Sequence, residues 1–239
     1  MIEIARAKTI TVPLTKDQGY DLDGILKKVN DKTKMVVITN PNNPTGQYLS
    51  YDAIDSFIQK IDKHVVVLID EAYIELATAP DCKTMISLIK KYPDQPILVM
   101  RTFSKYYAMA GVRVGYLIAQ KEYIDGINVI PGSTVARGAQ AAALQALKEQ
   151  DYYAGLKEKI VAGARYIEEE LRKLGCDVYT TQTNFILFDP HMNYEEVRDK
   201  LLDKGIHISI PMMDRVSVST KENNEYFIAC MKEILEGSD

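Results

Sequence analysis

Short apolar runs alternate with amphipathic stretches over the first half of the chain. Such runs occur at 35–39, 65–70, 97–100 and 115–119. The first three are rich in β-branched residues, which predicts buried strands of a parallel sheet. Between the first two, residues 51–61 carry apolar side chains at helical spacing behind Ser50, a suitable N-cap. This strand–helix–strand order indicates an α/β fold whose mostly parallel sheet has helices on both faces.

The pattern changes after about residue 136. Residues 137–150 are rich in Ala, Leu and Gln, which favour helix, and 151–174 continues as a helix for which Gly175 suits the C-terminal cap. Short strands at 177–180, 184–188 and 215–219 then alternate with helices that begin near Tyr194 and Glu222. We expect residues 1–148 to form a large domain. Residues 149–239 would form a bridging helix and a small C-terminal α+β domain.

Composition and charge exclude several classes of protein. The chain is 46% hydrophobic and 26% charged with a formal net charge of -4, so we expect no nucleic-acid or membrane partner. No run reaches the roughly 18–20 apolar residues of a membrane span, and the N-terminus lacks the pattern of a signal peptide. The three cysteines are widely spaced and the three histidines form no metal motif. We therefore expect reduced thiols, no metal and a cytoplasmic protein.

Three polar segments follow the predicted parallel strands. NPNNPTG (40–46) follows the first, DEAY (70–73) ends the second, and RTFSK (101–105) follows the third, with Arg113 eight residues beyond Lys105. Each segment alone is compatible with an ordinary turn, strand cap or surface loop. The carboxyl ends of parallel strands meet at one edge of the sheet, where open α/β sheets bind ligands. We therefore expect the three segments to form one site.

The residue types at this edge suit an aldehyde cofactor that carries a phosphate. A lysine can form a Schiff base with an aldehyde. Hydroxyls and a guanidinium donate the charge-assisted hydrogen bonds that a phosphate accepts. An acid at the end of a buried strand is costly unless it is paired, and a pyridinium nitrogen would be such a partner.

These motifs, together with VPLTKDQGYDLDGIL, TQTNFILF and RVSVSTKENNEYF, follow one another in the order of a known family. The sequence resembles the fold-type I, class I/II aminotransferases that depend on pyridoxal 5′-phosphate (PLP), and in particular the histidinol-phosphate aminotransferase branch. The resemblance runs essentially end to end. It implies ping-pong transfer of an amino group between an amino acid, or an amino-alcohol phosphate, and a 2-oxo acid. It also implies a homodimer or larger homo-oligomer.

The resemblance also implies roles for individual residues. Cofactor contacts are expected from Asn43, Asp70, Tyr73, Thr102, Ser104, Lys105 and Arg113, of which Lys105, Asp70 and Tyr73 are the catalytic candidates. Lys105 would carry the cofactor and move the substrate α-proton, and Asp70 would face the pyridine nitrogen. Asn43 and Tyr73 would contact the phenolic oxygen, and the remaining three would hold the phosphate. Arg215 would bind the substrate α-carboxylate, with Asn184 near the substrate.

The sequence departs from the family pattern in two respects. Ser209 stands about where the family commonly has an arginine, and Ser219 where it usually has glycine, which implies an altered distal pocket and a substrate other than histidinol phosphate. The family also has a substantial segment before the part that matches residues 5–15. That segment supplies a helix N-terminus for the phosphate, so we expect this chain to bind PLP weakly. A truncated non-catalytic protein, or a PLP-dependent decarboxylase or oxidase, are the alternatives.

Overall fold

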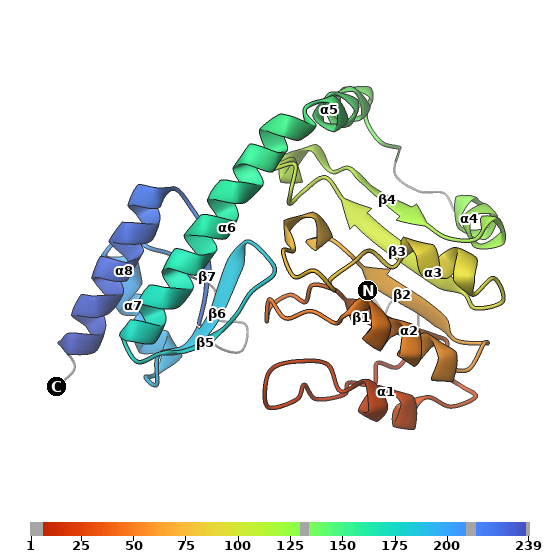
Figure 1. The fold of residues 1–239 in the computed structure, drawn as a ribbon, viewed down its shortest axis with the longest axis horizontal. Helices are drawn as coiled ribbons and strands as arrows, with labels where there is room; N and C mark the ends of the chain where they lie inside the picture. Colours follow the sequence, from red (N-terminus) through yellow and green to blue (C-terminus); the bar gives the residue numbers. More distant parts are fainter. Residues whose placement is uncertain (1–6, 130–133, 209–213, 238–239) are drawn as a thin grey trace.

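A four-stranded sheet forms the core of the N-terminal half. The structure, a computed structural model, describes residues 7–129, 134–208 and 214–237. The strands β1 (Met35–Thr39), β2 (Val66–Asp70), β3 (Ile97–Thr102) and β4 (Gly115–Ile118) lie in sequence order across the sheet (Figure 1). β1, β2 and β3 pair in parallel, as predicted, whereas β4 runs antiparallel to β3. The α/β class and the mostly parallel sheet are confirmed.

Helices α1 (Leu22–Lys28), α2 (Tyr51–Lys60) and α3 (Ile86–Lys91) contribute to a single apolar core with one face of this sheet. α2 turns Ile54, Phe57 and Ile58 inward, and its Ser50 N-cap accepts a hydrogen bond from the Ala53 amide at 3.2 Å. Each of those apolar side chains contributes about 1.5–3 kcal/mol by leaving water. The sequence pattern predicted α2, but α1 and α3 are short and were not predicted.

The opposite face of the sheet differs from our expectation of helices on both faces. Met35 is 46% exposed, Val37 50% and Met100 37%, in the part of the chain that the structure describes. Strands with apolar residues at successive positions have two apolar faces, so the pattern predicts burial on both sides. The described helices cover one side only, and the other presents an apolar surface.

A second sheet forms the C-terminal half. β5 (Asp177–Tyr179), β6 (Phe185–Asp189) and β7 (Asp214–Ser217) pair antiparallel in that order. The long helix α6 (Gln150–Lys173) and helices α7 (Tyr194–Asp203) and α8 (Lys221–Glu236) enclose its core. α4 (Lys121–Asn128) and α5 (Arg137–Lys148) connect the two halves. Gly175 adopts φ +84 just after α6, as its predicted capping position requires. Among the described residues, no helix has both the length and the apolarity to cross a membrane.

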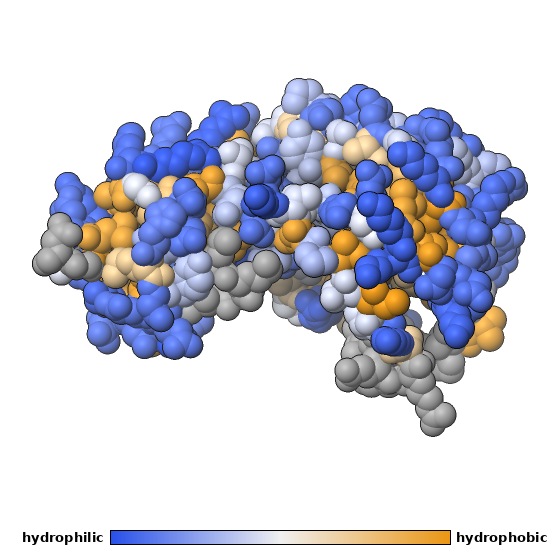
Figure 2. Space-filling model, turned by 90° about the horizontal axis from the view of Figure 1, so that it is seen from below, coloured by the Kyte–Doolittle hydropathy of each residue, from blue (hydrophilic) through white to orange (hydrophobic). Residues whose placement is uncertain are grey.

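The two halves contact each other through loops. Gln182 Oε1 accepts hydrogen bonds from the backbone amides of Thr78 at 2.7 Å and Ala79 at 2.9 Å. The backbone amide of Gln182 donates to Gly46 O at 2.9 Å. Figure 2 shows the halves as two rounded masses joined across the middle, with hydrophobic surface visible on each. These contacts hold the second sheet against the loops that leave β1 and β2.

Candidate active site

The carboxyl edge of the large sheet brings the predicted segments together. Thr39 pairs with Asp70, and Asp70 pairs with Met100, so β1, β2 and β3 end side by side. The chain leaves β1 into residues 40–46, β2 into η1 (Ile74–Leu76) and β3 into the loop that carries Lys105. The expectation that these three segments share one edge is confirmed.

Lys105, Tyr73 and Asp70 form the centre of this edge. Lys105 Nζ lies 5.2 Å from the centroid of the Tyr73 ring, which is itself buried. Asp70 Oδ1 accepts a hydrogen bond from the Ala72 amide at 3.0 Å. Burial raises the pKa of Asp70, and this hydrogen bond and the positive charge of Lys105 oppose that rise. A further cation beside Asp70 would favour its charged form.

Arg215 reaches this edge from the second sheet. Its Nη1 donates a hydrogen bond to Asn43 Oδ1 at 2.6 Å, across 172 positions of sequence. Its guanidinium also lies 5.0 Å from the centroid of the Phe185 ring, and that ring meets Tyr73 edge-on with centroids 5.4 Å apart. Arg215, Asn43, Phe185, Tyr73 and Lys105 therefore form a continuous chain of contacts between the two halves.

The proposed phosphate ligands lie at the end of β3 and in the segment between β3 and β4. Thr102 Oγ1 donates to Ser104 Oγ at 2.9 Å and accepts from the Ser104 amide at 3.0 Å. Arg113 is exposed, adopts φ +58, and donates from Nη1 to Ala110 O at 2.7 Å. One such bond occupies only part of a guanidinium with five N–H donors, so the group can also bind an anion.

The structure adds to the expectation for Asn184. The carbonyl of Asn184 accepts from the Val218 amide at 2.9 Å, and it is the next residue, Phe185, whose ring contacts Arg215 and Tyr73.

Tyr20 also lies near the site, although the sequence did not indicate this. Its hydroxyl accepts from the Thr39 amide at 2.9 Å, and burial raises the pKa of Tyr20, with the charge of Asp70 adding to the rise. No local signal marks Tyr20, because only the fold brings the segment before α1 to the end of β1. Ser209 lies outside the described residues.

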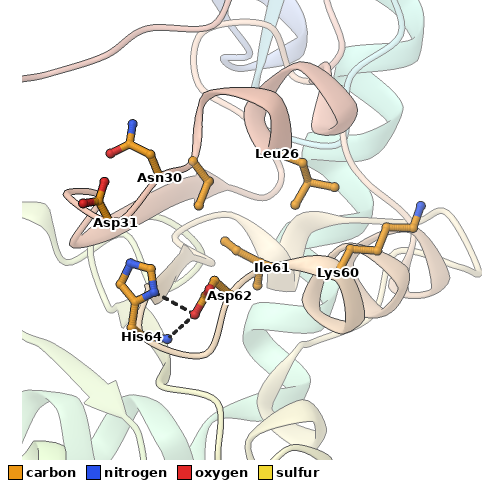
Figure 3. A pocket seen from close by; sticks show the side chains of 8 residues that line it. Leu26, Asn30, Asp31, Lys60, Ile61, Asp62 and His64 are labelled. Atoms are coloured by element: carbon orange, nitrogen blue, oxygen red, sulfur yellow. Dashed lines mark hydrogen bonds and ion pairs between the residues drawn. The ribbon is translucent and has the colours of Figure 1, made fainter.

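A surface hollow lies elsewhere on the large sheet's half of the molecule. It encloses ≈ 640 Å³ at the amino end of the strands, between the ends of α1 and α2 (Figure 3). Its lining consists of Leu26, Val29, Asn30, Asp31, Lys60, Ile61, Asp62 and His64. His64 Nδ1 contacts Asp62 Oδ1 at 2.7 Å on this surface. None of the residues with a predicted catalytic or binding role lines the hollow, so size alone does not locate the chemistry.

Comparison with solved structures defines the class by its fold. The histidinol-phosphate aminotransferase of Sinorhizobium meliloti, solved in complex with pyridoxal-5′-phosphate, matches 98% of this chain and 66% of its own, with a TM-score of 0.88 and 26% identity. That of Clostridium acetobutylicum matches 94% of this chain and 70% of its own, with a TM-score of 0.85 and 26% identity. The fold is that of the fold-type I aminotransferases.

Sequence comparison identifies the family. Residues 1–230 match the family described as aminotransferase class I and II, and the chain belongs to this family of PLP-dependent enzymes. It is 37% identical over 242 residues to the histidinol-phosphate aminotransferase of Bacillus pumilus, covering 98% of this chain and 66% of that protein. It is 42% identical over 226 residues to that of Staphylococcus aureus, covering 92% and 62%. The chain thus spans just under two thirds of the length of these relatives.

Proposed function

We propose that the protein is an aminotransferase that moves an amino group between an amino acid, or an amino-alcohol phosphate, and a 2-oxo acid. The observation that carries this proposal is the convergence of Lys105, Asp70 and Tyr73 at the carboxyl edge of the sheet, with Arg215 reaching the same edge from the second sheet. An amine can carry an aldehyde cofactor, an acid can pair with its ring nitrogen, and a guanidinium can bind a substrate carboxylate. Membership of the aminotransferase family supports the same function.

The residues at this edge fit PLP by their chemistry. Asp70 is partly buried with one backbone donor on Oδ1, so a pyridinium nitrogen would complete its pairing. The hydroxyls of Thr102 and Ser104 and the guanidinium of Arg113 supply donors for a phosphate. Lys105 Nζ is the amine that would carry the cofactor. PLP supplies an electron sink that stabilises negative charge at the substrate α-carbon.

The remaining steps belong to side chains of this chain. Arg215 binds the α-carboxylate of the substrate through its planar guanidinium. Its present partner, Asn43 Oδ1, is neutral, and a carboxylate is a stronger acceptor for the same donors. Lys105 Nζ, once it is free and neutral, would accept the proton from the substrate α-carbon and deliver it to C4′ of the cofactor. Tyr73 and Phe185 exclude water beside that nitrogen.

Ser219 bears on the identity of the substrate. The relatives are histidinol-phosphate aminotransferases, but Ser219 occupies a position where the resemblance implies that the family usually has glycine. In the structure the Ser219 amide donates to Asn224 Oδ1 at 2.9 Å, and Asn223 Nδ2 donates to Ser219 Oγ at 3.0 Å. The serine therefore helps to fix the start of α8 beside β7, and we propose a substrate other than histidinol phosphate.

Borohydride reduction of the PLP-treated chain tests the function. We expect the reduced cofactor on the peptide that contains Lys105, and Lys105→Arg to lose that label. Lys157→Arg is the matched control, because Lys157 is also partly buried but donates from Nζ to Ala77 O at 2.8 Å. Labelling of other lysines in place of Lys105, in a sample that clearly holds PLP, would contradict the proposal.

A further inference from the structure

A buried carboxylate stands directly beside the proposed catalytic residues. Glu71 follows Asp70 and precedes Tyr73 by two positions, and its side chain is 0% exposed. An ionised carboxylate in the interior is costly unless donors surround it. Glu71 is not among the residues expected to contact the cofactor or the substrate.

Donors from two other segments surround the Glu71 carboxylate. Oε2 accepts from Arg101 Nε at 3.0 Å and Nη2 at 2.9 Å, and from Thr84 Oγ1 at 2.9 Å. Oε1 accepts from the Met85 amide at 2.6 Å. The two bonds from Arg101 approach one oxygen from a rigid planar group, so they fix direction as well as distance. The ion pair is well shielded from water, because the Arg101 side chain is only 15% exposed.

This ion pair joins the two segments that carry the reacting groups. Arg101 lies four residues before Lys105, and Glu71 lies between Asp70 and Tyr73. The last register pair between β2 and β3 is Asp70 with Met100, and the Glu71 amide still donates to Met100 O at 2.9 Å. Beyond that point β2 continues into the loop before η1, whereas β3 runs on to Thr102 and pairs there only with β4. The ion pair holds the start of the loop after β2 against the end of β3.

A second acid extends the connection. Arg101 Nη1 donates to Glu75 Oε1 at 3.3 Å, and Glu75 lies in the 3-10 turn that follows Tyr73. Arg101 thus contacts an acid on each side of Tyr73, whose ring faces Lys105 Nζ. Rotation of the 71–75 segment would move this ring and would break both contacts with Arg101.

We propose that Glu71 is a positioning residue that, through Arg101, holds Asp70 and Tyr73 in register with Lys105 so that the lysine is correctly placed for PLP. This proposal rests on the proposed function. Glu71 acts without touching cofactor or substrate, because its donors come from Arg101, Thr84 and Met85. Loss of its charge would leave Glu75 as the acidic partner of Arg101 among the described residues and draw the guanidinium away from β2.

Borohydride trapping of PLP at Lys105, measured as a rate at subsaturating PLP, tests the proposal. Glu71→Gln keeps the size of the side chain and removes its charge. We expect trapping at Lys105 to slow by about tenfold or more, since small displacements of a reacting group have effects of this order. Labelling of other lysines should remain unchanged, whereas loss of overall stability alone would raise it.

The matched control is Glu168→Gln. Glu168 is 6% exposed and accepts from the Thr181 amide at 2.7 Å, and it pairs with Arg172 at 3.6 Å. Its contacts lie on α6 and the loop before β6, away from β2 and β3, so trapping at Lys105 should match the parent. Equal rates in Glu71→Gln and the parent, or an equal loss in Glu168→Gln, would overturn the proposal.

A milder variant decides the question if Glu71→Gln does not fold. Thr84→Val removes one donor to Glu71 with little change of shape, and we expect a smaller slowing at Lys105 in the same direction. An unchanged rate would refute the positioning role. The parent is the internal reference: absence of Lys105 labelling there overturns the proposed function itself, whereas normal labelling in both parent and variants overturns only this inference.

Discussion

Replacement of Asp214 by Asn should stabilise the C-terminal half of the protein, and the gain should increase with pH. Asp214 begins β7, is 0% exposed, and neither carboxyl oxygen has a hydrogen-bond partner among the described residues. Burial raises the pKa of Asp214 from 3.8 to about 7, and the nearby charge of Asp189 adds to the rise. Cys176 and Tyr194 also face this pair.

The sign of the pH dependence follows from these values. Below pH 3.8 the carboxyl is protonated in both folded and unfolded chains, so it imposes no penalty. Between pH 3.8 and about 7 the unfolded chain releases the proton and the folded chain retains it, so stability falls as pH rises. The two values differ by about three pH units, which corresponds to about 4 kcal/mol at the upper limit. Above about pH 7 the penalty is constant.

Urea unfolding of the parent and Asp214→Asn, followed by circular dichroism at pH 5 and pH 8, measures this penalty. We expect the stability gained by the variant over the parent to be at least about 1 kcal/mol larger at pH 8 than at pH 5. Most of the penalty in the parent develops between these two pH values. Asp203→Asn, at the exposed end of α7, is the control and should show the same difference at both pH values. An equal gain from Asp214→Asn at both pH values would refute the idea that the fold holds this carboxyl neutral.

Three further predictions concern the site and its supports. Asp70→Asn should retain PLP, measured by absorbance titration, but slow the half-reaction with an amino acid by orders of magnitude, because a neutral amide does not keep the pyridine nitrogen protonated; an unchanged half-reaction would contradict the role of Asp70. Arg215→Lys should raise the amino-acid concentration needed for half-saturation without changing the PLP absorbance spectrum, since lysine lacks the planar fork; unaltered saturation would place the carboxylate elsewhere. Gly46→Ala should destabilise the chain by at least about 2 kcal/mol in urea unfolding, because Gly46 has φ +72 and a Cβ there would lie 2.3 Å from Thr181 Oγ1. The matched Gly111→Ala change, with no atom within 4 Å of the new Cβ, should leave stability nearly unchanged.

The sequence by itself determined the strands, the order of the chemistry along them and the family. β1 was predicted with its observed bounds and β3 within two residues, because continuous β-branched runs between polar turns have few alternative conformations. The meeting of Asp70 and Lys105 at one edge also followed, since parallel strands end on the same side of a sheet. The short helices α1 and α3 did not, because seven and six residues carry too little periodic signal.

Only the tertiary structure decided which side chains contact one another across the two halves. Arg215 and Asn43 are 172 residues apart, and nothing in either segment indicates that one donates to the other. The same holds for Glu71 and Arg101, whose adjacency depends on the register of β2 against β3. The sheet face that the described helices leave uncovered is a further example, because a strand's residues show that a face is apolar but not whether a helix packs on it. Local pattern specifies elements and their ends, whereas contacts between distant elements depend on how the whole chain packs.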